Sequence, residues 1–170
     1  MGRKKWTKKD WRFSYGDSIC CYRTAGVLIR NGKILVQREK DGNEYALPGG
    51  HVAIGETSEE SLIREFKEET GADISCSRMI WVEEAFWKWG NKNAHTIAFY
   101  YLMSLKNESE IPDGYFESQK DNCDVLLEWV SIDELKNLTI YPPFIKGKIF
   151  NISDGIEHFV REREFAQKGG

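Results

Sequence analysis

The pattern of apolar and polar residues predicts strands and tight turns over the first part of the chain. Apolar residues dominate the stretches 19–29 and 33–38, and the dipeptide Asn31-Gly32 between them is a strong signal for a β-hairpin. Asp41-Gly42-Asn43 predicts a second turn, which leads into a short strand at 45–47. We therefore expect the folded domain to begin with a hairpin and a further strand.

A helical pattern begins after Pro48-Gly49-Gly50, which interrupts the strands. Thr57 with Glu60 three residues later is a capping box, and Gly71 is the expected helix stop. Between these signals an apolar stripe at helical spacing is formed by Leu62, Ile63 and Phe66. The sequence thus predicts one helix with a defined start and a defined end.

The rest of the chain alternates strand patterns with turns and ends in a predicted helix. Strand patterns cover 74–86, 95–105 and 125–130, with a loop at Gly90-Asn91 and a polar loop at 106–124. Further along, Ser131 and Glu134 predict a second capping box over a short helix, Pro142-Pro143 a turn, and residues 153–167 an amphipathic C-terminal helix with Ile156, Phe159 and Val160 facing inward. Together these elements predict one mixed α/β domain over residues 18–170, preceded by a basic arm at 1–17.

The helix predicted after Thr57 carries more acid than stability alone favours. Glu68 and Glu69 lie in its last turn, where the helix dipole opposes each anion by about 0.3–1 kcal/mol. Glu65 lies three and four positions before them, so the three carboxylates share one side and repel one another. A divalent cation removes this repulsion, and clustered carboxylate oxygens are the ligands that Mg²⁺ or Mn²⁺ prefers. The alternative interpretation is a solvated acidic face.

Two neighbouring features favour the metal-binding interpretation. Arg64 is four positions from both Glu60 and Glu68, so it can brace the acids. Gly49 and Gly50 precede the helix and, lacking a Cβ, allow the backbone to pass close to a ligand.

The same segment resembles the complete Nudix box. Gly50 is followed by five residues, Glu56, seven residues, and then Arg64-Glu65-Phe66-Lys67-Glu68-Glu69-Thr70-Gly71-Ala72. Every polar and glycine position matches; Phe66 and Ala72 stand where the family has an aliphatic residue, and both are apolar. Flanking motifs at 45–50 and 128–135 extend the resemblance over residues 18 to 138.

The resemblance implies an α/β/α sandwich with a mixed central sheet, and hydrolysis of a diphosphate bond in a nucleoside diphosphate linked to another group, with Mg²⁺ or Mn²⁺ as cofactor. It implies that Glu65, Glu68 and Glu69 are catalytic and bind the metal, that the Gly49 carbonyl is a backbone ligand, and that Glu56 and Arg64 position the acids. Either Glu65 or Glu69 is the expected general base. Subfamilies that act on particular substrates carry signatures after the box. Residues 84–90 match none of these signatures, so the substrate subclass is unassigned.

Several residues outside the box are candidates for additional roles. A further catalytic acid is sought among Glu83, Glu84, Glu117 and Asp121. Arg38 is a candidate for phosphate binding, because a guanidinium fork fits phosphate oxygens. Tyr45, Phe86, Trp87 and Trp89 are candidates for stacking on a base, with packing as the alternative. His51, His95 and His158 show no spacing typical of a site and are interpreted as structural.

Composition narrows the remaining function classes. The net charge of −3 makes no case for nucleic-acid binding, and the basic arm is interpreted as a solvated tail. No apolar run is long enough to span a bilayer and no signal peptide is apparent, so we expect a cytoplasmic protein. Its four cysteines lack zinc or disulfide spacing and are expected to be free. The expected partner is a small nucleoside diphosphate derivative, and a homodimer is a possible assembly.

Three other functions compete with this interpretation. A non-catalytic Nudix-fold module would bind nucleotides, although such modules lose box acids that this chain keeps. A prenyl diphosphate isomerase would need a cysteine tied to the box. A nucleic-acid module would rest on the basic arm alone.

Overall fold

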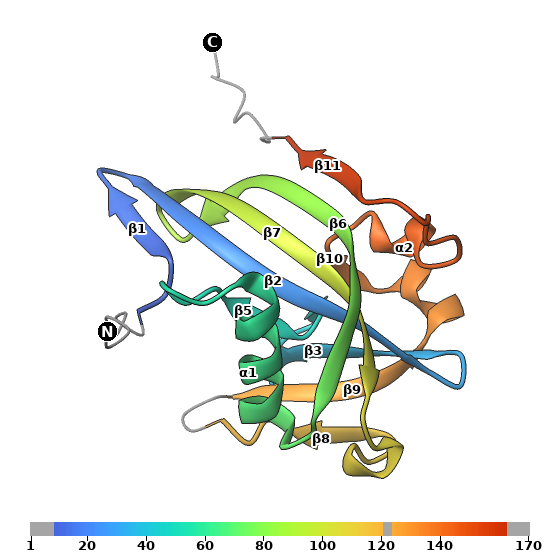
Figure 1. The fold of residues 1–170 in the computed structure, drawn as a ribbon. Coiled ribbons are helices and arrows are strands. Elements are labelled where there is room, and N and C mark those ends of the chain that lie inside the picture. Colours follow the sequence, from blue (N-terminus) through green and yellow to red (C-terminus); the bar gives the residue numbers. More distant parts are fainter. Residues whose placement is uncertain (1–8, 121–123, 163–170) are drawn as a thin grey trace, which may run out of the picture.

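A computed structural model describes residues 9–120 and 124–162 of the chain and is built around one mixed sheet (Figure 1). The strands are β1 (Arg12–Tyr15), β2 (Ser18–Arg30), β3 (Lys33–Glu39), β4 (Glu44–Ala46), β5 (Gly49–His51), β6 (Ile74–Trp89), β7 (Lys92–Leu105), β8 (Tyr115–Glu117), β9 (Val125–Ser131), β10 (Thr139–Tyr141) and β11 (Glu157–Arg161). The helices are α1 (Ser58–Thr70) and α2 (Ile145–Lys148), with 3₁₀ segments η1 (Glu108–Glu110) and η2 (Ile132–Asn137).

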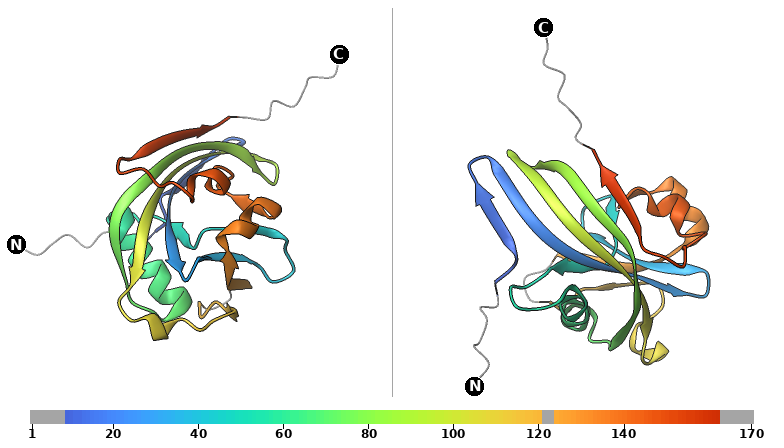
Figure 2. Two further views of the ribbon diagram at one scale, coloured as in Figure 1. Left: turned by 90° about the vertical axis from the view of Figure 1, so that its right-hand side faces the viewer. Right: turned by 45° about the horizontal axis from the view of Figure 1, so that its top comes forward.

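The order of strands along the sheet is β10-β4-β3-β2-β7-β6-β11. Strand β2 is parallel to β7, and β10 and β11 are parallel to β4 and β6, whereas the other pairs in this row are antiparallel. Strands β1 and β5 both pair with β2, and β9 joins β3 to β8. The long strands β2, β7 and β6 curve together, with β11 along the edge of β6 (Figure 2).

The predicted hairpin at Asn31-Gly32 is confirmed. Both residues have positive φ, 52° and 73°, which is the geometry of the tight turn that suits the twist of two antiparallel strands. Ile29 of β2 pairs with Ile34 of β3 directly beside this turn. The turn chemistry therefore sets the register of the two strands.

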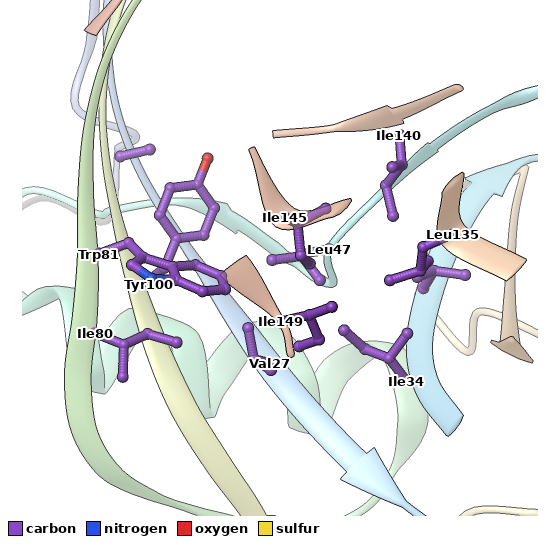
Figure 3. Packing of buried hydrophobic residues seen from close by; sticks show 12 residues of the cluster. Val27, Ile34, Leu47, Ile80, Trp81, Tyr100, Leu135, Ile140, Ile145 and Ile149 are labelled. Carbon is purple, nitrogen blue, oxygen red and sulfur yellow. The ribbon is translucent and has the colours of Figure 1, made fainter. Parts of the chain in front are cut away.

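Apolar residues form two main clusters on opposite faces of the sheet. Adjacent residues such as Ile34 and Leu35 belong to different clusters, as alternation along a strand requires. One cluster lies under α1, whose Leu62 and Phe66 are buried in it. The other is covered by η2 and α2 and is shown in Figure 3. The expected α/β fold with a mixed central sheet and helical segments on both faces is confirmed.

The predicted C-terminal helix is wrong where the structure describes it. Residues 157–161 form β11, whose backbone pairs with the edge of β6. Phe159 packs inward and Val160 is 52% exposed, because side chains alternate between the two faces of a strand. Ile156, which precedes the strand, is 60% exposed. Residues 163–170 of the prediction lie outside the described residues.

Two smaller predictions also need correction. Ser131 makes no side-chain capping bond, because the segment after it winds as a 3₁₀ helix and not as an α-helix. The polar loop at 106–124 contains η1 and β8.

Cysteines and membrane-spanning helices were also considered in the sequence, and residues 9–120 and 124–162 bear on both. Cys20, Cys21 and Cys76 are free thiols, and Cys123 lies outside these ranges. No helix within the ranges is long and apolar enough to cross a membrane.

Candidate active site

Helix α1 begins and ends where the sequence predicts, and it buries part of its acidic side. The Thr57 hydroxyl accepts a hydrogen bond from the Glu60 amide at 3.1 Å, and the Glu60 carboxylate accepts one from the Thr57 amide at 2.8 Å. Glu65 and Glu69 are each only 5% exposed. The alternative of a solvated acidic face is therefore wrong for these two carboxylates.

The glycines before the helix are needed for close packing around Glu65. A Cβ added to Gly50 would lie 2.6 Å from Cδ of Glu65, and one added to Gly49 would lie 2.1 Å from the Thr24 carbonyl oxygen. Both glycines are on β5, which pairs with β2 on one side and lies against α1. The absence of side chains here lets β5 fit between β2 and the acidic helix.

Arg64 joins three glutamates of the box. Its Nε donates to both carboxylate oxygens of Glu56, at 3.2 and 3.0 Å, and its terminal nitrogen donates to Glu65 at 2.8 Å and to Glu68 at 3.4 Å. Burial lowers the pKa of Arg64, but the hydrogen bonds to Glu65 and Glu56 outweigh it and raise the pKa. Ser61 donates to Glu56 at 2.8 Å and fixes the far end of this chain of contacts.

Lys120 is a part of the site that the sequence did not reveal. It follows β8, and its Nζ lies 2.7 Å from Oε2 of Glu65 and 3.5 Å from Oε2 of Glu68. Burial raises the pKa of Glu65, but the hydrogen bonds from Lys120 and Arg64 outweigh it, so the pKa is lowered. Glu65 is thus an ionised carboxylate held between two cations.

Glu69 has a different environment from Glu65. Its Oε2 is buried and has no hydrogen-bond partner. Burial, followed by repulsion from Glu65, raises the pKa of Glu69 to about 7. A buried acceptor without a donor is costly unless a ligand or ion completes it.

The side chains of the box have the donor atoms that a divalent cation prefers. Carboxylate oxygens are hard donors, Glu69 presents an unpaired one, and the cluster already accommodates the positive charge of Lys120. In residues 9–120 and 124–162, no three His, Cys, Asp or Glu side chains are placed to hold a metal ion as they stand. The ammonium group of Lys120 lies against Glu65 and Glu68, so a cation that enters must compete with it.

Arg23 on β2 is a second residue that the sequence did not single out. Its charge favours the ionised form of Glu69 and opposes protonation of His51. The side chain is half-buried, and no hydrogen bond or ion pair joins its guanidinium to another residue of the described part of the chain. Arg23 lies within a predicted strand, and the pattern of that strand gave no signal that the charge of Arg23 acts on the box.

The predicted phosphate and stacking residues lie in varied surroundings. Arg38 donates to the carbonyls of Glu39, Lys40 and Gly42 and so closes the turn after β3. Tyr45 packs against the cluster covered by α2. Trp87 donates its indole N–H to Thr96 at 3.0 Å and stacks on Trp89. The structure does not bring these side chains to the box, and their roles in substrate binding stay predictions.

The candidates for a further catalytic acid lie in different parts of the structure. Glu117 is exposed and pairs with Lys40, Glu84 pairs with His158, and Asp121 lies outside the described residues. Glu83 is buried and lines a pocket of about 910 Å³, which Arg23 and Trp87 also line.

The sequence matches one family model and several known proteins. The family model described as the NUDIX domain matches residues 22–148. A putative ADP-ribose pyrophosphatase, YjhB, from Bacillus subtilis is 31% identical over 93 residues, which cover 55% of this chain and 42% of YjhB. An ADP-ribose pyrophosphatase from Methanocaldococcus jannaschii is 47% identical over 49 residues, which cover 27% of this chain and 29% of that protein. The chain spans less than half the length of either relative.

Solved structures show the same fold. An ADP-ribose pyrophosphatase from Streptococcus suis superposes with a TM-score of 0.55 at 18% identity, covering 82% of this chain and 98% of the other. A NUDIX hydrolase from Nitrosomonas europaea gives a TM-score of 0.60 at 11% identity, covering 88% and 82%. At these identities the likeness concerns the fold alone.

Proposed function

Because the chain belongs to the Nudix family, we propose that it is a hydrolase that cleaves a diphosphate bond in a nucleoside diphosphate linked to another group, with Mg²⁺ or Mn²⁺ as cofactor. The observation that carries the proposal is the pair of buried carboxylates, Glu65 and Glu69, beside Gly50, with one Glu69 oxygen lacking a partner. A chain folded only for stability has no use for such a pair.

The residues that would hold the cation are Glu65, Glu68, Glu69 and the carbonyl of Gly49. When bound, a divalent cation neutralises phosphate oxygens and makes a water molecule more acidic. Arg64 keeps Glu56, Glu65 and Glu68 in fixed positions through its hydrogen bonds. The site is therefore organised before the substrate arrives.

Glu69 is the residue we assign to accept the proton of the attacking water. Both Glu65 oxygens already face cations, Arg64 on one side and Lys120 on the other. Glu69 retains a buried acceptor oxygen that no donor satisfies. A general base must have such a free acceptor within reach of the water.

Arg23 is the residue we assign to the phosphate groups. Its guanidinium is not committed to another described side chain, it lines the pocket, and its charge acts on Glu69. A guanidinium can donate two parallel hydrogen bonds to phosphate oxygens. Arg23 pairs with His51 of β5, next to Gly50, so the phosphate groups would lie near the start of the box.

A hydrolysis screen tests this function. The purified protein with Mg²⁺ or Mn²⁺ is assayed against ADP-ribose, nucleotide sugars, dinucleoside polyphosphates, coenzyme A and nucleoside triphosphates. The names of the two pyrophosphatase relatives make ADP-ribose and nucleotide sugars the first substrates to try. We expect turnover of at least one compound, abolished by excess EDTA. Turnover that survives EDTA would refute the metal mechanism, and tight binding without turnover would favour the non-catalytic module.

A further inference from the structure

The pocket of about 910 Å³ lies on the face of the sheet that points away from α1. Ala98 and Tyr100 of β7 line it, whereas their neighbours Phe99 and Tyr101 pack in the cluster under α1. Because side chains alternate along a strand, the pocket and α1 occupy opposite faces.

One row of residues crosses the floor of this pocket. Arg23 of β2 is paired with Ala98 of β7, and Ala98 is paired with Glu83 of β6. Arg23 and Glu83 are therefore two strand spacings apart, roughly 10 Å, with only the small Ala98 between them. Arg23 also pairs with His51 of β5, next to Gly50, so the Arg23 end of this row is nearer the start of the box than the Glu83 end.

Glu83 is a buried carboxylate with unused acceptor capacity. It is 2% exposed, and its Oε2 accepts a hydrogen bond from the Tyr100 hydroxyl at 2.7 Å. Burial and the Glu83 charge raise the pKa of Tyr100, so this hydroxyl keeps its proton and remains the donor. In Figure 3 it points away from Val27 and Ile149 of the apolar cluster. The other oxygen, Oε1, is buried without a hydrogen bond.

Arg161 balances the charge of Glu83 but donates no hydrogen bond to its Oε1 atom. The Nε of Arg161 lies 3.3 Å from Oε1 of Glu83, but the two atoms are not aligned for a hydrogen bond. The pair is neutral overall, so a cationic ligand gains little there. A neutral ligand that donates hydrogen bonds gains more, because an ionised carboxylate can accept about four.

We propose that this pocket binds the non-phosphate end of the substrate, with the Glu83 carboxylate accepting hydrogen bonds from two adjacent neutral donors. This inference rests on the proposed function, since Arg23 is taken to mark the phosphate end. Two parts of a nucleotide substrate carry such donors: the N1–H and N2–H₂ edge of guanine, and the vicinal hydroxyls of a ribose. An adenine edge, which presents one donor group beside an acceptor, does not fit as well.

The test measures binding of monophosphates by calorimetry in EDTA, so that no diphosphate bond can be cleaved. GMP is compared with IMP, which lacks the 2-amino group, and ribose 5-phosphate is compared with 2-deoxyribose 5-phosphate. We expect one of the two comparisons to show a loss on the order of tenfold when the donor is removed, the size of a lost bidentate contact. If neither comparison differs by more than threefold in the wild-type protein, the inference is overturned.

Two glutamine variants test whether Glu83 causes the discrimination between these ligands. Glu83→Gln keeps an acceptor oxygen for Tyr100 and should abolish the discrimination, reducing the difference to less than threefold. Glu84→Gln removes the same charge from the next residue of β6, which pairs with His158, and should leave the discrimination unchanged. Discrimination that persists in Glu83→Gln, or is lost equally in Glu84→Gln, would assign the donors to another site. The wild-type comparison stands even if Glu83→Gln does not fold.

The outcomes separate this inference from the proposed function. If the protein hydrolyses diphosphates but binds the ligands of each comparison equally, the proposed function is correct and the Glu83 contact is wrong. A protein that discriminates between the monophosphates but hydrolyses no diphosphate has the contact without the function.

Discussion

The ammonium nitrogen of Lys120 lies 2.7 Å from Oε2 of Glu65, although 55 positions separate the two residues along the chain. The same nitrogen lies 3.5 Å from Oε2 of Glu68. The single charge of Lys120 is thus shared between two of the carboxylates that are proposed to bind the metal. A cation that enters the site must compete with this ammonium group.

Replacing Lys120 with methionine should tighten metal binding. Lys120→Met removes the competing charge but keeps most of the aliphatic stem. We expect the Kd for Mn²⁺, measured by titration with electron paramagnetic resonance, to fall roughly two- to fivefold, which corresponds to a partly exposed ion pair worth up to about 1 kcal/mol. The control is Lys67→Met on α1, since Lys67 pairs with Asp73. Weaker Mn²⁺ binding in Lys120→Met would show that Lys120 supports the metal site.

Glu69 should make the metal-free protein less stable as the pH rises. Its pKa is about 7 in the folded chain against an ordinary value of 4.5, so between these values the folded state holds a proton that the unfolded state has lost. The free energy of unfolding therefore falls between about pH 4.5 and pH 7 and stays lower above it.

Glu69→Gln should remove this fall. At pH 8 the metal-free variant should be more stable than the wild type by an amount on the order of 3 kcal/mol, because each unit of pKa shift is worth about 1.4 kcal/mol. Urea unfolding at pH 5 and pH 8 measures the difference. A variant that is less stable than the wild type at pH 8 would mean that Glu69 is structural.

Gly50 should be required for the position of Glu65. In Gly50→Ala the new Cβ would lie 2.6 Å from Cδ of Glu65, which Arg64 and Lys120 hold in place. We expect kcat to fall on the order of tenfold or more, because misplacing a catalytic group by about 1 Å can cost up to 100-fold. Gly147→Ala, where nothing lies within 4 Å of the added Cβ, is the matched control. Equal kcat in both variants would contradict the packing argument.

Local signals in the sequence predicted the elements that depend on a few neighbouring residues. The capping box at Thr57, the stop at Gly71 and the turn at Asn31-Gly32 all appear as expected, because each is decided by hydrogen bonds or φ angles within one turn. The acidic helix was likewise recognisable from the spacing of its glutamates.

Contacts between distant segments were not predictable in this way. Lys120 is one cation in a polar stretch, and only the fold brings it to Glu65. Arg23 lies in a strand, and the apolar pattern of that strand does not reveal that Arg23 acts on the charge of Glu69. The last strand, β11, has an apolar spacing that also suits a helix, and the free edge of β6 decides between the two.

The kcat of Glu69→Gln relative to that of Glu59→Gln tests the central claim most directly. Both variants remove one negative charge from α1, but Glu59 lies exposed in the first turn, where the helix dipole favours it, and outside the box acids. We predict that Glu69→Gln lowers kcat on the order of 10²-fold or more with little change in KM, as expected for the loss of a general base, and that Glu59→Gln keeps nearly full activity. Equal losses in the two variants would mean that bulk charge, and not a site, supports the reaction. Full activity in Glu69→Gln would contradict the account.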